Sequence, residues 1–68
     1  MELSNSIKVH RAINNLTQSE LADKAGVTRK TINTVENSKF IPSTVLALKL
    51  AKILGVSVED LFTLNDAG

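Results

Sequence analysis

The chain has 68 residues, a formal net charge of +1 and no cysteine. A chain this short hides only about 60% of the surface that its unfolded form exposes, so we expect one domain over residues 1–68 whose thin core benefits from a partner subunit. The lack of cysteine excludes a disulfide and a thiolate metal site. No apolar run approaches the roughly 20 residues of a membrane span, and no signal-peptide pattern is present, so we expect a cytoplasmic protein.

Charge is distributed unevenly along the chain. Residues 24–39 hold four basic side chains against the single acid Glu36, whereas residues 55–68 hold three acidic side chains and no basic one. The basic residues are Lys24, Arg29, Lys30 and Lys39, and the acidic ones near the end are Glu59, Asp60 and Asp66. A basic middle and an acidic end favour one surface for a polyanion and another surface for a different contact.

The first helix is predicted over about residues 6–15, after the capping candidates Ser4 and Asn5. A second helix starts after Thr17, because in "TQSE" the Thr17 hydroxyl can accept from the Glu20 N–H while the Glu20 carboxylate accepts from the Thr17 N–H. Its apolar face consists of Leu21, Ala22 and Ala25.

Gly26 is expected to end the second helix, because glycine takes a positive φ without penalty. Thr28 then caps a third helix that runs to about Glu36, with Ile32 and Val35 facing inward. The ring of a proline in the following loop, "NSKFIP", prevents that helix from continuing.

Ser43 caps a fourth helix, residues 44–54, which ends at Gly55, and Ser57 caps a fifth over residues 58–62. The fourth helix carries apolar residues on more than one face, namely Leu46, Leu48, Leu50, Ala51, Ile53 and Leu54. Residues 1–3 and 62–64 can pair as a short two-stranded ribbon. The predicted fold is therefore all-α, a five-helix bundle with this ribbon as a possible addition.

Residues 17–37 have the arrangement of a helix-turn-helix, because two short helices are joined by a turn at Gly26 that is followed by the apolar Val27. The outward face of the later helix, about residues 28–36, carries Arg29, Lys30, Asn33 and Thr34. Arginine and lysine donate to guanine O6 and N7, and asparagine can pair bidentately with adenine. The pattern therefore predicts that this helix reads bases in the major groove.

These residues resemble the Xre/Cro-type helix-turn-helix family of phage repressors and bacterial regulators, and the similarity covers nearly the whole chain. "IKVHRA" is similar to the first helix of the family, "LTQSELA" to the second and "VTRKTINTVEN" to the recognition helix. "PSTVLALKLAKILGVSVEDLF" is similar to the last two helices. The resemblance implies a small helical domain that regulates transcription by binding double-stranded DNA.

The resemblance also implies roles for single residues. Arg29 and Lys30 match the base-reading positions that open the recognition helix, and Asn33 and Thr34 match its next turn. Gln18 matches a glutamine that contacts the DNA backbone and braces a side chain of the recognition helix. Further contacts with the DNA backbone are implied at Thr28, Thr31, Asn37 and Lys39.

Arg11 and Glu36 match a buried ion pair that ties the first helix of the family to its recognition helix. We interpret this pair as structural, because it orients two helices and makes no direct contact with DNA. Removing one partner would leave a buried charge uncompensated.

A single recognition helix contacts too few base pairs to select one site among about 10⁶ or more competitors. We therefore expect a symmetric homodimer whose two helices enter successive major grooves of an inverted repeat, about 34 Å apart. Its predicted interface consists of Val58, Leu61, Phe62 and Leu64, which are apolar and lie beyond the main core. The alternative is that Val58 and Leu61 cover the core of their own chain.

The function predicted from the sequence is that of a sequence-specific transcriptional regulator, and of a repressor because no activating or sensing module is recognisable. One alternative is an antitoxin-type autoregulator that also binds a partner protein, although the tail "TLNDAG" is short for wrapping around a toxin. Another is a protein-interaction domain without DNA binding, for which a neutral or acidic recognition helix is expected.

We find no nucleophile with a base, no phosphate loop and only the lone His10 as a metal candidate, so we expect no enzyme, metal, cofactor or small-molecule effector.

Overall fold

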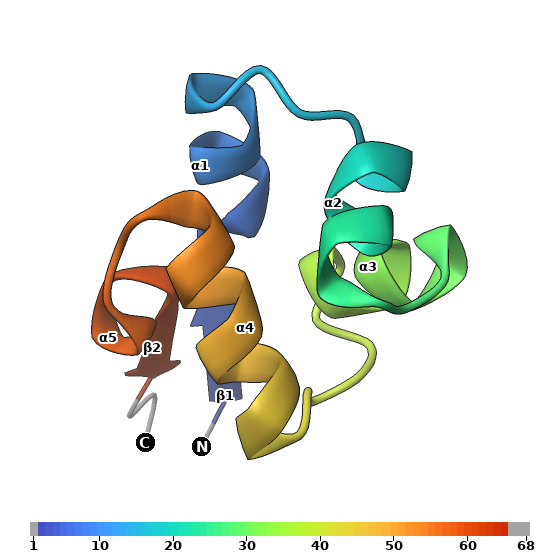
Figure 1. Cartoon of the computed structure of the whole chain (residues 1–68). Helices are drawn as coiled ribbons and strands as arrows, with labels where there is room; N and C mark the ends of the chain where they lie inside the picture. The colour runs from blue at the N-terminus through green and yellow to red at the C-terminus, as the bar shows by residue number, and fades with distance from the viewer. Residues whose placement is uncertain (1, 66–68) are drawn as a thin grey trace.

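The computed structural model describes residues 2–65 and contains five helices and a two-stranded antiparallel sheet (Figure 1). The elements in chain order are β1 (Glu2–Asn5), α1 (Ile7–Ile13), α2 (Gln18–Ala25), α3 (Arg29–Glu36), α4 (Thr44–Leu54), α5 (Val58–Leu61) and β2 (Phe62–Asn65). The predicted helical bundle and its terminal ribbon are thus confirmed. Two residues used in the predictions, Met1 of the ribbon and Asp66 of the acidic end, lie outside the described residues.

The ribbon is longer than predicted and shortens the fifth helix. β1 and β2 pair with Leu3 opposite Leu64 and Asn5 opposite Phe62. Phe62 has extended backbone angles, φ −121° and ψ 136°, so the helix predicted to include it ends at Leu61. Phe62 extends the pairing with β1 instead of extending α5, a choice that depends on a strand from the other end of the chain.

The first helix is shorter than predicted at both ends. It stops at Ile13 instead of continuing to residue 15, because Asn15 adopts the left-handed conformation with φ 56°. Asparagine takes this conformation more readily than most residues, and it ends a helix. At the start of α1, the Asn5 side-chain oxygen accepts from the Ile7 N–H at 3.2 Å, whereas the N-cap residue Ser6 makes no capping side-chain bond.

One apolar core joins all five helices. Its buried members are Ile7, Leu21, Ala22, Ala25, Ile32, Val35, Leu46, Leu50, Ala51, Leu54 and Leu61. The predicted inward faces of the second and third helices are therefore confirmed. The fourth helix buries only part of its apolar surface, because Leu48 is 57% exposed. None of the helices in the described part of the chain has the length and hydrophobicity of a membrane span.

Two reciprocal capping boxes start helices at the predicted positions. The Glu20 N–H donates to the Thr17 hydroxyl at 3.0 Å, and the Thr17 N–H donates to the Glu20 carboxylate at 2.9 Å. Ser57 and Asp60 form the same pair of bonds at the start of α5. The hydrogen bond from the capping N–H lowers the pKa of both carboxyl groups, which therefore stay ionised to a lower pH than an unpaired carboxyl group does.

Gly26 ends α2 in the left-handed conformation with φ 73°, as predicted, and no atom lies within 4 Å of the place where a Cβ would be. A substitution here is therefore disfavoured by backbone conformation alone. We expect Gly26→Val to lower the free energy of unfolding by about 2 kcal/mol, because β-branched residues avoid positive φ. Gly26→Asn is the matched control and is expected to cost less. Equal melting temperatures for wild type and Gly26→Val would contradict this account.

Candidate nucleic-acid interface

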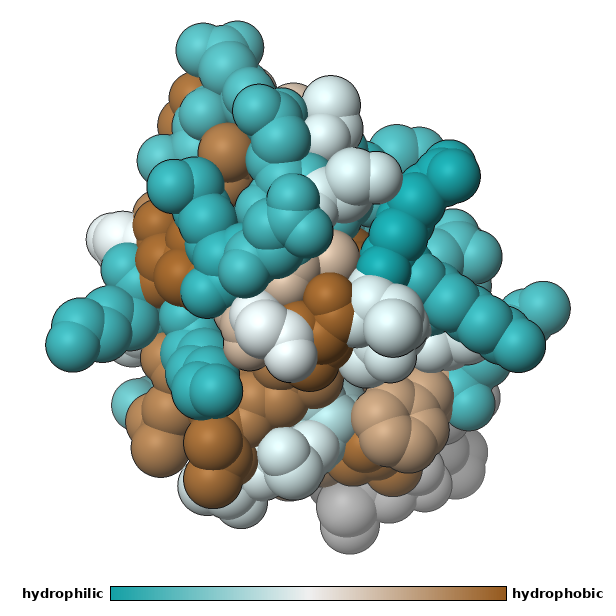
Figure 2. All heavy atoms as spheres, turned by 45° about the vertical axis from the view of Figure 1, so that its right-hand side comes forward, coloured by the Kyte–Doolittle hydropathy of each residue, from teal (hydrophilic) through white to brown (hydrophobic). Residues whose placement is uncertain are grey.

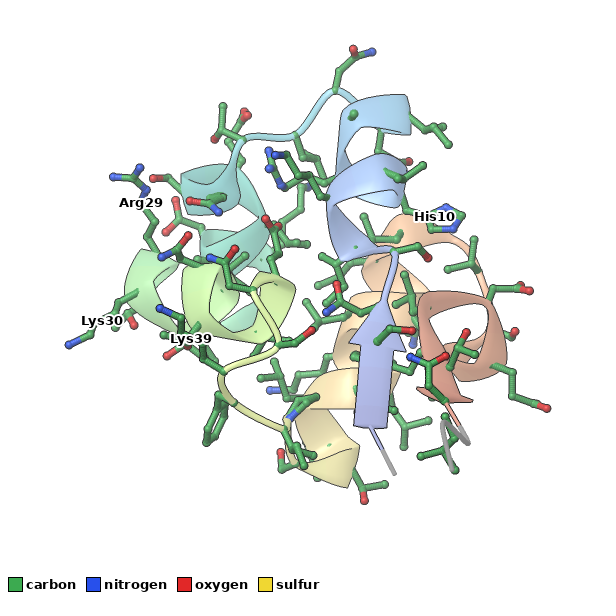
Figure 3. The ribbon with its side chains drawn as sticks, turned by 180° about the vertical axis from the view of Figure 1, so that it is seen from behind. His10, Arg29, Lys30 and Lys39 are labelled. Atoms are coloured by element: carbon green, nitrogen blue, oxygen red, sulfur yellow. The ribbon has the colours of Figure 1, made fainter. Side chains whose placement is uncertain are left out.

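Helix α3 lies across the end of α2 and presents one face to solvent. Ile32 and Val35 fix its inner face, since both are buried in the core. Figure 3 shows that Arg29 and Lys30 of α3 and Lys39 of the loop behind it project from the same side of the molecule, whereas His10 projects from the opposite side. Three cationic side chains therefore stand together, as the sequence predicts for a surface that meets a polyanion.

The four predicted base-reading residues share this outer face but differ in how exposed their side chains are to solvent. Arg29, Lys30 and Asn33 are exposed, whereas Thr34 is half-buried. The Thr34 hydroxyl lies 3.0 Å from the Lys30 carbonyl oxygen and 2.9 Å from the Thr31 carbonyl oxygen, and it donates its proton to these backbone groups. Thr34 can therefore offer a base only its oxygen lone pair and its methyl group.

The side chains predicted to contact phosphates also cluster around α3. The Thr28 hydroxyl caps the helix by accepting from the Thr31 N–H at 3.2 Å, and it is 3.0 Å from the Thr31 hydroxyl. Both donors of the Asn37 amide are used within the protein, because they bond Asn33. Lys39 is exposed beyond the end of α3 and has an unhindered ammonium group for a phosphate.

The predicted ion pair joins α1 to the end of α3. Arg11 Nε donates to Glu36 Oε2 at 2.9 Å, with the two side chains only 16% and 5% exposed. Arg11 also donates to the Leu16 carbonyl oxygen at 3.0 Å, which fixes the loop before α2. Gln18 Nε2 donates to Glu36 Oε1 at 3.1 Å. The pair is thus the centre of a polar network that connects the first three helices.

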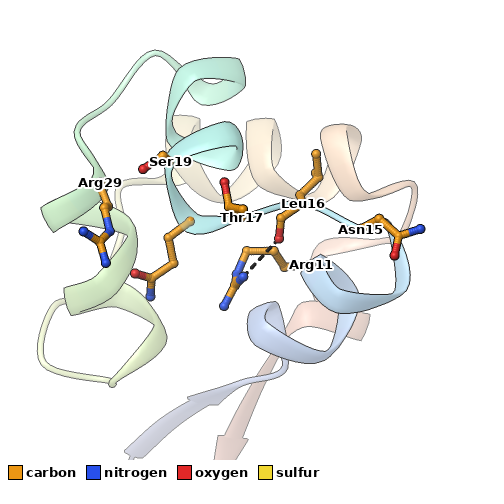
Figure 4. Close-up of a pocket in the computed structure, with 7 residues that line it drawn as sticks. Arg11, Asn15, Leu16, Thr17, Ser19 and Arg29 are labelled. Carbon is orange, nitrogen blue, oxygen red and sulfur yellow. Dashed lines mark hydrogen bonds between the residues drawn. The ribbon is translucent and has the colours of Figure 1, made fainter.

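A hollow of about 590 Å³ lies at the start of α2, beside this network (Figure 4). Its lining consists of Arg11, Asn15, Leu16, Thr17, Gln18, Ser19 and Arg29. The first N–H groups of α2, at Gln18 and Ser19, have no acceptor within the helix and carry the positive end of its dipole. With the Arg29 guanidinium alongside, this hollow has the electrostatics of a phosphate site.

The side chain of Gln18 is fully used by its contacts with the recognition helix. Its amide nitrogen donates to Glu36 at 3.1 Å and to Asn33 Oδ1 at 3.3 Å, so both of its side-chain N–H groups are engaged. The implied brace to the recognition helix is therefore present. A bond from this side chain to a phosphate would require one of these contacts to break, whereas the Gln18 backbone N–H is free for it.

A known protein family covers the segment from the start of α1 to the end of α5. The helix-turn-helix family model matches residues 7–61. An HTH-type transcriptional regulator of Methanocaldococcus jannaschii is 48% identical over 64 residues, which cover 94% of this chain and 97% of the relative. The chain belongs to the helix-turn-helix family of transcriptional regulators. The resemblance to its Xre/Cro type is thereby confirmed.

Solved structures agree with this assignment. A candidate DNA-binding protein from Bacteroides fragilis matches with a TM-score of 0.81 and 31% identity, over 90% of this chain and 98% of that one. The regulator SinR in a complex with DNA matches with a TM-score of 0.72 and 35% identity, over 78% of this chain and 86% of that one. This helix-turn-helix regulator therefore shares its fold with a protein whose crystal structure has been solved in complex with DNA.

Sequence reasoning missed two residues of the site in this helix-turn-helix regulator. The Asn5 amide donates to the Val35 carbonyl oxygen at 2.9 Å and to the Glu36 carbonyl oxygen at 3.4 Å, and so caps the end of α3 from β1. Ser19 lines the hollow at the start of α2. No local signal marks Asn5 for this role, because its partner lies 30 residues away. The position of Ser19 in the first turn of a capped helix was the available signal for it.

Proposed function

We propose that this helix-turn-helix regulator is a sequence-specific repressor that acts as one DNA-binding domain and binds an inverted-repeat operator as a homodimer. Helix α3 enters the major groove, where Arg29, Lys30, Asn33 and Thr34 contact base edges. Residues around the helix contact the DNA backbone, namely Gln18 through its backbone N–H, Thr28, Thr31 and Lys39. Asn37 is left out of this set, because its amide donors both bond Asn33. The repressor blocks transcription by occupying promoter DNA. This mode of action needs no contact surface beyond the one that binds DNA.

The observation that carries this proposal is the exposed polar face of a firmly anchored α3. Arg29 and Lys30 form no ion pair among the side chains of residues 3–65, where the only ion pair is Arg11–Glu36. A second hollow, of about 320 Å³, is lined by Gln18, Arg29, Lys30 and Asn33. The charges of Arg29 and Lys30 are thus unpaired, and both side chains line the same hollow as two polar amides. This arrangement favours a ligand that is negatively charged and has polar edges.

An apolar groove beside α4 supports the homodimer. We call it the α4 groove; it has a volume of about 450 Å³. It is lined by Leu3, Pro42, Thr44, Ala47, Leu48, Val58, Glu59 and Phe62. Leu64, which is 66% exposed, pairs with Leu3 and therefore lies on the same face of the ribbon. Figure 2 shows hydrophobic side chains gathered over the lower part of the molecule, where α4 lies in Figure 1.

The burial of these residues changes the interface that we propose. Leu61 was expected to face a partner, but it is only 1% exposed and belongs to the core of its own chain. Val58 and Phe62 are half-buried and show their free surface in the α4 groove. The proposed interface therefore consists of the α4 groove with Leu64, and it excludes Leu61.

The position of the α4 groove suits an operator with two half-sites. Pro42, which lines the groove, lies in the same short loop as Lys39, so the groove begins next to the end of α3. The molecule measures 36 × 21 × 20 Å, and two copies joined side by side can separate their recognition helices by the one helical turn of DNA, about 34 Å.

The operator is tested by repeated selection of bound fragments from random double-stranded DNA, followed by sequencing. We expect an enriched inverted repeat with half-site centres about 10 base pairs apart. When this repeat is placed within a promoter, purified protein should reduce the transcript in a reconstituted transcription reaction. Binding without an enriched sequence would contradict sequence-specific recognition. No binding at all, even at low salt, would instead support a protein-interaction domain.

The interface is tested by sedimentation equilibrium of wild type and of a Leu48→Glu, Leu64→Glu double variant. Both side chains are exposed in the monomer, so the variant is expected to fold, whereas two charges in an apolar interface should abolish the dimer. Ile13→Glu is the matched control, because Ile13 is an equally exposed apolar residue, at 67%, on α1. A monomeric wild type at tens of micromolar, or a dimer that resists the double change, would refute the interface.

A further inference from the structure

The side-chain oxygen of Asn33 is already occupied within the protein, although Asn33 lies on the outer face of α3. The Gln18 amide nitrogen donates to Asn33 Oδ1 at 3.3 Å, and the Asn37 amide nitrogen donates to the same oxygen at 3.1 Å. A carbonyl oxygen has two lone pairs, so these two donors saturate it. In contrast, the Asn33 amide nitrogen donates to no acceptor among residues 3–65 and is free for a ligand.

The orientation of the Asn33 amide is determined through Gln18 on one side. The Glu36 carboxylate pairs with Arg11 at 2.9 Å, and a carboxylate can only accept hydrogen bonds. Gln18 must therefore turn its amide nitrogen toward Glu36, and the same nitrogen then faces Asn33. Only an oxygen of Asn33 can accept there, since a rotated Asn33 would place two donors against each other.

Asn37 imposes the same orientation independently. Its amide nitrogen donates to the backbone carbonyl oxygen of Asn33 at 2.8 Å, which can only accept. The Asn37 side chain therefore cannot rotate to present its own oxygen. Because it also bonds Asn33 Oδ1, the Asn33 amide is held with its oxygen toward the protein and its two N–H groups toward solvent.

We propose that Asn33 reads its base pair purely as a donor and selects guanine, not the adenine that an unconstrained asparagine would favour. Guanine presents two neighbouring acceptors, N7 and O6, in the major groove, which match two N–H groups. Bidentate pairing with adenine needs a side-chain oxygen to accept from N6, and this oxygen is saturated. The inference rests on the proposed function, because it requires α3 in the major groove.

The test compares sites selected from random DNA by wild type and by Asn33→Ala. The base pair whose preference disappears in the variant is the one that Asn33 reads. There, wild type should prefer guanine over adenine by roughly 5- to 150-fold in competition between matched probes, and 7-deazaguanine, which lacks N7, should weaken binding. Adenine at this pair, or no pair that depends on Asn33, would overturn the inference while an enriched site still supports the proposed function. Failure of wild type to enrich any site would overturn both.

A second variant tests whether the network sets the preference. Gln18→Ala with Asn37→Ala removes both donors from Asn33 Oδ1 and leaves the Asn33 side chain in place. The guanine-to-adenine ratio at the same base pair should then fall toward one or reverse, whatever happens to the overall affinity. Asp23→Ala is the matched control, because Asp23 is an exposed polar residue of the same helix α2 that lines neither hollow and does not bond Asn33, and its ratio should equal that of wild type. An unchanged ratio in the double variant would overturn the inference.

Discussion

Replacing Glu36 by alanine is expected to lower the free energy of unfolding by about 3–5 kcal/mol. The Glu36 carboxylate is 5% exposed and accepts from Arg11 Nε at 2.9 Å, so its removal leaves a largely buried guanidinium without its counter-ion. The Gln18 amide loses an acceptor as well. A domain of this size is stabilised by only about 3–10 kcal/mol in total. A substantial fraction of the variant should therefore be unfolded at room temperature, which urea titration followed by circular dichroism measures.

Two further variants distinguish the loss of stability caused by breaking the Arg11–Glu36 ion pair from a general effect of removing a carboxylate. Asp23→Ala removes an exposed acid of α2 and is expected to change the free energy of unfolding by less than about 0.5 kcal/mol. Arg11→Met with Glu36→Leu removes both charges together and is expected to recover much of the stability, because no unpaired charge remains. If Glu36→Ala unfolds at the same urea concentration as wild type, the pair has no structural role.

Replacing Arg29 by alanine is expected to cost about 1–3 kcal/mol at the selected operator and to relax the base preference at one pair of each half-site. The reason is that the guanidinium, exposed at the start of α3, can donate to two acceptors of one base. Lys39 is exposed behind the helix and is expected to meet a phosphate. Lys39→Ala should therefore weaken operator and random DNA alike and reduce the magnitude of the salt slope by about 1.

Both variants are measured by fluorescence titration on operator and random duplexes at several salt concentrations. Lys52→Ala is the matched control, because it removes one positive charge from α4, away from α3. It should leave the ratio of operator to random affinity unchanged. Equal losses on both duplexes for Arg29→Ala would show that Arg29 binds only a phosphate. A loss confined to the operator for Lys39→Ala would show that Lys39 reads a base.

Local sequence determined the helices and the turn that make up the motif. The capping residues Thr17, Thr28, Ser43 and Ser57 all start helices where they were expected to, and Gly26 and Gly55 end them with φ 73°. Each of these signals acts within about four residues, through a hydrogen bond to a free N–H or a backbone angle that only glycine takes easily. The same locality explains why α4 has the predicted bounds, and why the outward residues of α3 could be predicted from helical spacing.

Only the tertiary structure decided the features that depend on distant segments. Phe62 leaves α5 because Asn5 is available as its strand partner, and Leu61 then turns into the core instead of toward a second copy. The Asn33 amide is oriented by Gln18, 15 residues away. Such choices depend on which lone pairs and apolar surfaces remain unsatisfied once the helices have packed. They therefore cannot be predicted from the spacing of residues along one helix.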